Sequence, residues 1–154
     1  MARTLLDILA REQSLLRTFV GLLNDEASML NGLPSTEDLL DVTDRKNQAI
    51  DDIQRVGMER EAWLTAHGYA EGLNGMAAIE AEDMEIEQGW SELRNVADQA
   101  AKLNQANGAL ISTHLDHTQS RLNMLRRMQS DATEIYDARG LGRTSRRQRD
   151  IAAG

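Results

Sequence analysis

The sequence predicts an all-α protein, and three observations support this prediction. Its 154 residues are rich in Leu, Ala, Met, Gln, Glu and Arg, with a single proline and few aromatic residues. Most of these residue types favour helices. No segment alternates β-branched with polar residues, whereas apolar residues recur at steps of three and four. We therefore predict an antiparallel, coiled-coil-like bundle of three helices, with a long third helix and a mobile C-terminal tail.

The first predicted helix is about 28 residues long. Its apolar stripe consists of Leu5, Leu9, Leu16, Phe19, Leu23 and Leu30, and Glu12 and Glu26 are polar members of the same series. Asn31-Gly32 predicts a left-handed end to this helix. Pro34 opposes its continuation, because proline lacks the backbone N–H of a helix interior.

A second helix is predicted to begin after Ser35, since Ser35 and Asp38 have the spacing of a capping box. Its apolar stripe consists of Leu39, Val42, Ala49, Ile53, Val56 and Trp63. We expect this helix to end near His67-Gly68. The sequence GYAEGLNG that begins at Gly68 has too many glycines for a predicted helix.

The next segment, from Met76 to Trp90, is dense in acidic residues, with five carboxylates between Glu80 and Glu87. It is expected to be a short helix or an irregular connection. The carboxylates lack the spacing of a calcium-binding loop. A solvated acidic face near a helix start is therefore the better interpretation, although the sequence leaves the geometry of this segment open.

The third predicted helix runs from about Trp90 to Met128, close to 60 Å at the usual rise per residue. The first two helices would each cover only part of that length. Beyond Ser130 the apolar periodicity is lost. Residues 131–154 hold five arginines against four acidic side chains, a net charge of +1, which leaves residues 1–130 at −9. We expect a helical bundle over residues 1–130 and a flexible basic tail over residues 131–154.

Asn104, Asn107 and Gly108 interrupt the third helix where apolar residues would pack better. Asn107 lies on the apolar stripe, at a run of three successive four-residue steps that rotates the stripe around the helix. A buried asparagine fixes helix register, and Gly108 would let a neighbouring backbone approach. Alternatively, the packing partner of the stripe changes here: before Asn107 the stripe packs against the first two helices, and after it the stripe faces a partner outside this chain. The two interpretations are compatible.

Charge and composition exclude several classes of protein. The formal net charge of −8 argues against nucleic acid as the main partner. The chain has no cysteine, which excludes disulfides and thiolate chemistry and fits the cytoplasm. The N-terminal stretch is apolar only in stripes, so neither a signal peptide nor membrane insertion is expected.

The sequence offers no convincing catalytic or metal-binding constellation. His114 and His117 are three residues apart, but Glu-x-x-His pairs are lacking. No glycine-rich phosphate loop is found, and no Ser, His and Asp lie in a strand–turn setting. Four arginines between Arg143 and Arg149 lack interleaved aromatic residues and are best read as a solvated tail. We expect no enzyme activity, no cofactor and no metal.

The end of the third helix carries an apolar stripe that the other two helices are not expected to reach. It includes two methionines, Met124 and Met128, beside Leu122 and Leu125. Flexible thioether side chains suit surfaces that accept varied apolar partners. An uncovered stripe of this kind is typical of helix-in-groove binding, while filling of the protein's own core is the alternative.

The order of these features resembles the FlgN family of flagellar export chaperones. The similar features are Lys46 and Arg60 fourteen residues apart, Leu64, the segment LNQANGALI that contains Asn104 and Asn107-Gly108, and a Tyr–Gly tail with Tyr136 and Gly140. The Asn-x-x-Asn-Gly spacing is the most specific of these features. The resemblance covers nearly the whole chain.

The resemblance implies a cytoplasmic type III secretion chaperone. Such a protein binds the C-terminal amphipathic helices of the hook–filament junction proteins, FlgK and FlgL, and delivers them to the flagellar export gate. We expect the cargo-binding residues to be Ile111, Leu115, Leu122, Leu125, Met128, Ile135, Tyr136 and Leu141. Asn104, Asn107 and Gly108 are expected to set helix register and orientation, and Tyr136 is by analogy a contact for the export gate. The alternative is a structural coiled-coil adaptor or self-assembling homodimer that covers the stripe with a second copy.

Overall fold

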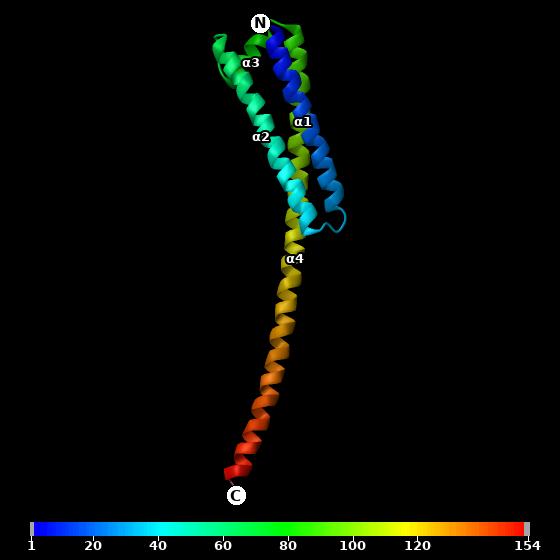
Figure 1. Ribbon diagram of the computed structural model, residues 1–154, viewed down its shortest axis with the longest axis vertical. Coiled ribbons are helices and arrows are strands. Elements are labelled where there is room, and N and C mark those ends of the chain that lie inside the picture. The colour runs from blue at the N-terminus through cyan, green and yellow to red at the C-terminus, as the bar shows by residue number, and fades with distance from the viewer. Residues whose placement is uncertain (1, 153–154) are drawn as a thin grey trace. The chain divides into compact units, whose positions relative to one another are not determined.

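The described part of the protein consists of four helices and the short connections between them. The computed structural model describes the backbone of residues 2–152 and the side chains of residues 4–113 and 115–131. Its helices are α1 (Ala2–Leu30), α2 (Thr36–Ala66), α3 (Gly72–Glu80) and α4 (Met84–Ala152), as Figure 1 shows. The all-α class is confirmed, and the described chain has one helix more than the sequence predicted. None of the described helices is both long and apolar enough to cross a membrane.

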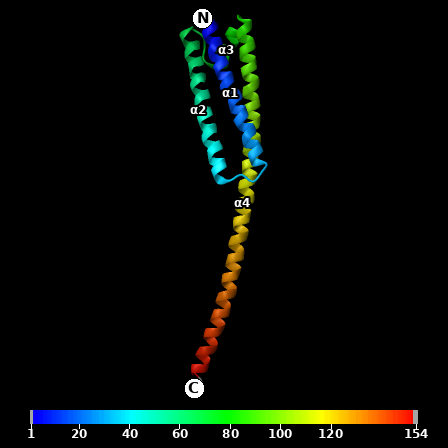
Figure 2. The ribbon, with the colours of Figure 1, turned by 45° about the vertical axis from the view of Figure 1, so that its right-hand side comes forward.

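The chain divides into two units, Met1–Leu110 and Ile111–Gly154. In the first unit, α1, α2 and the beginning of α4 lie side by side (Figures 1 and 2). Two hydrogen bonds show that α1 and α4 run in the same direction. Gln13 donates to Glu92 at 3.1 Å, and further along both helices Asn107 donates to the Leu23 carbonyl oxygen. The amides of Gln13 and Gln88 hold the pKa of the Glu92 carboxyl below its ordinary value.

The ends of α1 and α2 differ in how they are capped. Ser35 and Asp38 form the predicted capping box, with each side chain bonded to the backbone N–H of the other. Helix α1 ends at Leu30, directly before Asn31-Gly32 as predicted, but Gly32 is not left-handed; the left-handed glycines in the described chain are Gly68 and Gly72. At Gly68 the N–H of Tyr69 bonds to the Leu64 carbonyl and that of Gly68 to the Thr65 carbonyl. This is a Schellman motif, which ends α2.

Helix α3 begins within the glycine-rich sequence, where no helix was predicted, and continues into the segment from Met76 for which a short helix was one of two expectations. Its low intrinsic propensity is offset by packing, since Met76 and Ile79 are buried in the core. Gly75 is required here, because a Cβ at this position would clash with the carbonyl oxygen of Ala70. The close approach of α3 to the Ala70 carbonyl is therefore possible only with glycine at position 75.

Substitution of Gly75 tests this explanation of α3. Gly75→Ala should lower the free energy of unfolding by about 1–3 kcal/mol, as expected when the backbone must shift to accept an added methyl group. Gly108→Ala is the matched control, since nothing lies within 4 Å of its added Cβ. That variant should gain up to about 1 kcal/mol from helix propensity. Urea denaturation of both variants measures the difference, and equal destabilisation would contradict the close approach at Gly75.

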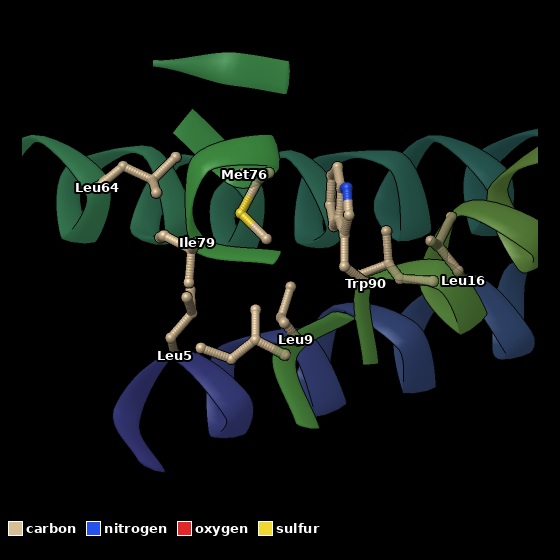
Figure 3. Close-up of a cluster of buried hydrophobic side chains, with 9 residues drawn as sticks. Leu5, Leu9, Leu16, Leu64, Met76, Ile79 and Trp90 are labelled. Atoms are coloured by element: carbon tan, nitrogen blue, oxygen red, sulfur yellow. The ribbon is translucent and has the colours of Figure 1, made fainter. Parts of the chain in front are cut away.

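The main core of the first unit joins all four helices. Figure 3 shows Leu5, Leu9 and Leu16 of α1 beside Leu64 of α2, Met76 and Ile79 of α3, and Trp90 of α4. A second cluster further along the bundle contains Phe19, Leu23 and Ala100. The apolar stripe predicted for the first helix is therefore the buried face of α1.

Two buried ion pairs fix the alignment of α1 with α2. Arg60 Nε donates to Glu12 Oε2 at 3.0 Å, and Lys46 Nζ lies 3.0 Å from Glu26 Oε2. The two acids are 5% and 3% exposed. Residue numbers rise along α1 as they fall along α2, so the helices are antiparallel. The acids are fourteen residues apart on α1 and the bases fourteen apart on α2, so both pairs form in one register.

Helix α4 is longer at both ends than the sequence predicted. It begins at Met84 instead of Trp90, where the Asp83 carboxylate accepts hydrogen bonds from the N–H groups of Glu85 and Ile86 at 3.0 and 3.3 Å. This capping stabilises the first turn within the acidic segment, because the side chain satisfies free N–H groups at the helix start. The helix also continues to Ala152 instead of ending near Met128. Residues 131–152 are helical although they lack an apolar stripe.

Candidate functional site

The candidate site is an exposed row of apolar side chains on α4, which we call the α4 stripe. Leu115, Leu122, Leu125 and Met128 are 64%, 44%, 61% and 62% exposed, and Ile111 at the start of the stripe is half-buried. Met124, beside the stripe, is 56% exposed. Among the described side chains, no others of comparable size are exposed in such a regular series on one helix. The structure thus places five of the predicted cargo-binding residues on one stretch of α4.

The spacing of the α4 stripe is that of a coiled-coil seam. In a heptad lettered a to g, Leu115 and Leu122 fall at position a, and Ile111 and Leu125 at position d. Positions a and d face a partner helix and supply the side chains that it packs against. Met128 falls at position g, on the margin of the seam. The stripe therefore matches one helix of a coiled coil with another helix along it.

The other predicted cargo-binding residues are Ile135, Tyr136 and Leu141. They lie in the last part of α4, and their side chains are outside the described residues. Their proposed role in cargo binding therefore stays a prediction.

Asn107 lies in the first unit, three residues before its end, and contacts α1. It is 2% exposed, and its Nδ2 donates a hydrogen bond of 2.8 Å to the carbonyl oxygen of Leu23. A register role for Asn107 requires such a buried, directional contact. Asn104 is exposed. The expected backbone approach at Gly108 is not observed, since nothing lies within 4 Å of a Cβ built there.

The Asn107 contact can be tested by an isosteric change. Asn107→Asp replaces the donor with a second acceptor facing the Leu23 carbonyl oxygen, in a buried position. We expect a loss of about 3 kcal/mol or more in the free energy of unfolding at pH 7. The loss should shrink as the pH falls, because burial raises the pKa of the new carboxyl and its protonated form is again a donor. Asn107→Leu, which leaves no buried charge, is the control, and chemical denaturation at pH 7 and pH 4 separates the two variants.

The first unit and the second differ in charge. Residues 1–110 carry nine basic and twenty acidic side chains, a net charge of −11, whereas residues 111–154 carry eight and five, a net charge of +3. Between residues 111 and 130, Arg121, Arg126 and Arg127 stand against the single acid Asp116. The sequence interpretation assigned the basic charge to the tail and missed the arginines beside the stripe. The heptad of the stripe could have identified two of them, since Arg121 falls at position g and Arg126 at position e, beside the apolar positions.

The described side chains include no cluster that could bind a metal ion. Within residues 4–113 and 115–131, no group of three or more His, Asp or Glu side chains is placed to hold a metal ion. The acidic residues of the Glu80–Glu87 segment instead serve the fold: Glu80 pairs with Arg94 at 3.0 Å, and Asp83 caps α4.

The fold and the site together define an all-α helical bundle with an exposed coiled-coil seam. The chain belongs to the FlgN protein family, whose model matches residues 1–144. The FlgN family is a family of flagellar chaperones and is not known for enzymes, so membership supports a chaperone role in flagellar assembly. No curated protein and no solved structure matches the chain.

Proposed function

We propose that this protein is a cytoplasmic type III export chaperone for the hook–filament junction proteins of the FlgK and FlgL type. It binds their C-terminal amphipathic helices and delivers them to the flagellar export gate. Family membership supports the general role in flagellar export, and the α4 stripe supports the choice of an amphipathic helix as cargo. No enzyme activity and no cofactor are part of this proposal.

The observation that carries the proposal is the exposure of the α4 stripe. Leu115, Leu122 and Leu125 are between 44% and 64% exposed although they have the spacing of a seam. Burying exposed leucines against a partner is favourable by about 1.5–3 kcal/mol for each side chain that becomes fully buried. A cargo helix with its own apolar stripe supplies that burial, and its stripe is covered in the same step.

The proposed roles of the residues follow from their positions. Ile111, Leu115, Leu122, Leu125 and Met128 line the surface on which the cargo helix lies. Ile135, Tyr136 and Leu141 close over the cargo, and Tyr136 also contacts the export gate. Asn104 and Asn107 orient α4 at the start of the stripe, where Asn107 is bonded to α1.

Co-purification with junction proteins tests the proposed function directly. The full chain should retain FlgK- and FlgL-type proteins, and it should not retain the same proteins after deletion of their C-terminal helix. Isothermal titration calorimetry then gives the affinity and a negative heat-capacity change for apolar burial. Failure to bind either intact junction protein would contradict the proposal. Equal binding with and without the C-terminal helix would contradict the choice of cargo segment.

Deletion of residues 131–154 separates cargo binding from folding. We expect the truncated chain to bind junction proteins more weakly, because the residues that close over the cargo are removed. The thermal unfolding midpoint of residues 1–110 should not change, since the buried core of the first unit is formed by residues before 111. Circular dichroism and calorimetry measure both effects. A lower midpoint after truncation would mean that these residues stabilise the bundle.

A further inference from the structure

The margins of the α4 stripe carry a pair of arginines. In the heptad that places Leu122 at a and Leu125 at d, Arg121 falls at position g and Arg126 at position e. Positions e and g border the seam, and their charges determine which helix pairs with which. Five residues separate the two arginines, which puts them about 140° apart around the helix, one on each side of the seam.

Within the described residues, Arg121 and Arg126 form no ion pair. Both are exposed, and no ion pair joins either guanidinium to a carboxylate of the described residues. The basic residues of the first unit differ in this respect, since most of them form ion pairs with acids of the same unit: Arg11, Arg45, Lys46, Arg55, Arg60, Arg94 and Lys102. The positive charge beside the α4 stripe is therefore free to act on a partner.

A second copy of this chain is a poor occupant of the stripe in a parallel arrangement. In a parallel two-helix coiled coil, a residue at g faces the residue at e five positions later on the other helix. Arg121 would then face Arg126 of the second copy, and the symmetric contact would repeat the conflict. An antiparallel arrangement pairs g with g and e with e, so an arginine meets the same arginine of the second copy only when the two-fold axis lies beside that residue. Like charges placed opposite each other at an interface are unfavourable.

We propose that the helix bound on the α4 stripe is an amphipathic helix of another protein, with Asp or Glu at the positions that face Arg121 and Arg126. The two arginines attract this helix and oppose parallel pairing with a second copy. This inference rests on the proposed function, because it assumes that the stripe binds a helix. It adds the charge pattern by which that helix is selected.

Two synthetic peptides provide the test. Both are about 21 residues long, three heptads, with identical leucines at a and d. One carries Glu at every e and g position and the other carries Gln. Gln is the better comparison than Lys, because residues 1–110 have a net charge of −11 and would attract a cationic peptide without regard to the stripe. Affinities are measured with the full-length chain by fluorescence anisotropy.

The wild-type chain should bind the Glu peptide roughly tenfold more tightly than the Gln peptide, as expected from two solvent-exposed charge pairs. The preference should weaken in high salt, because exposed charges are screened. Arg121→Glu with Arg126→Glu should abolish or reverse it. Arg127→Glu is the control of matched chemistry, since Arg127 falls at position f, away from the seam, and should retain the preference.

Each outcome decides the inference. Equal binding of both peptides, or an effect of Arg127→Glu as large as that of Arg121→Glu or Arg126→Glu, would overturn the selection by charge while leaving the stripe as a docking surface. If neither peptide binds, the stripe is not a helix-binding surface, and both this inference and the cargo surface of the proposed function fail. A wild-type dimer that Leu122→Asp with Leu125→Asp dissociates would show that the seam binds a second copy, and would also overturn the inference.

Discussion

The double substitution Leu122→Asp with Leu125→Asp should abolish binding of junction proteins while the chain stays folded. Both side chains are exposed, at 44% and 61%, so their replacement removes no core packing. Two leucines that become buried on binding contribute about 3 kcal/mol or more together, and their loss reduces the affinity at least about a hundredfold. Calorimetric titration gives the affinity, and circular dichroism reports the helix content.

The control for this variant is Leu40→Asp with Met58→Asp. Leu40 and Met58 lie on α2 and are exposed at 60% and 72%, so the control makes the same kind of change away from α4. It should bind junction proteins like the wild type. If the Leu122 and Leu125 variant also kept the wild-type affinity, the cargo would have to bind elsewhere on the molecule.

Arg60→Met should be among the most destabilising single substitutions in the protein. It removes the partner of Glu12, whose side chain is only 7% exposed in the ion pair. A buried carboxylate without its partner typically costs about 3–5 kcal/mol. Arg60 also lies over the ring of Trp90, 4.9 Å from its centroid, so part of the loss comes from that contact. Urea denaturation at neutral pH measures the total change.

Two further variants separate the contributions at Arg60. Adding Glu12→Leu to Arg60→Met should restore most of the lost stability, because no unpaired charge is then buried. Arg11→Met, one residue from Glu12, breaks the ion pair with Glu59, in which both side chains are about half exposed. It should cost less than about 1 kcal/mol, as exposed pairs usually do. Similar losses for Arg11→Met and Arg60→Met would contradict the distinction between buried and exposed pairs.

The sequence was sufficient for the fold class, but not for α3 or for either end of α4. The periodicity of α1 and the capping box at Ser35 are local signals, and both are confirmed. Helix α3 depends on the close contact of Gly75 with the Ala70 carbonyl, a tertiary effect that outweighs helix propensity. The end of α4 was misplaced because an apolar stripe was taken as the sign of a helix. A segment of polar helix formers can continue a helix without such a stripe.

The candidate site was predictable in its apolar part and not in its charged part. Leu115, Leu122 and Leu125 were chosen by their spacing, and the structure shows that they are exposed. Arg121 and Arg126 were missed because they gain meaning only from their position relative to that spacing. Similarly, Glu12 and Glu26 were recognised as polar members of a buried stripe, but their bases could be assigned only when the alignment of α1 with α2 was known.

The pairing of Glu12 with Arg60 and of Glu26 with Lys46 also limits how the α1–α2 hairpin can move. A slide of α1 along α2 by one heptad would bring apolar side chains back against apolar side chains, yet it would leave both acids buried without a basic partner. A slide by two heptads would rejoin only one acid with a base, such as Glu26 with Arg60. Every sliding step therefore faces an electrostatic barrier that separation of the two helices into water does not, because there each charge regains its hydration. If this hairpin rearranges, we therefore expect α1 and α2 to separate from each other and not to slide along each other.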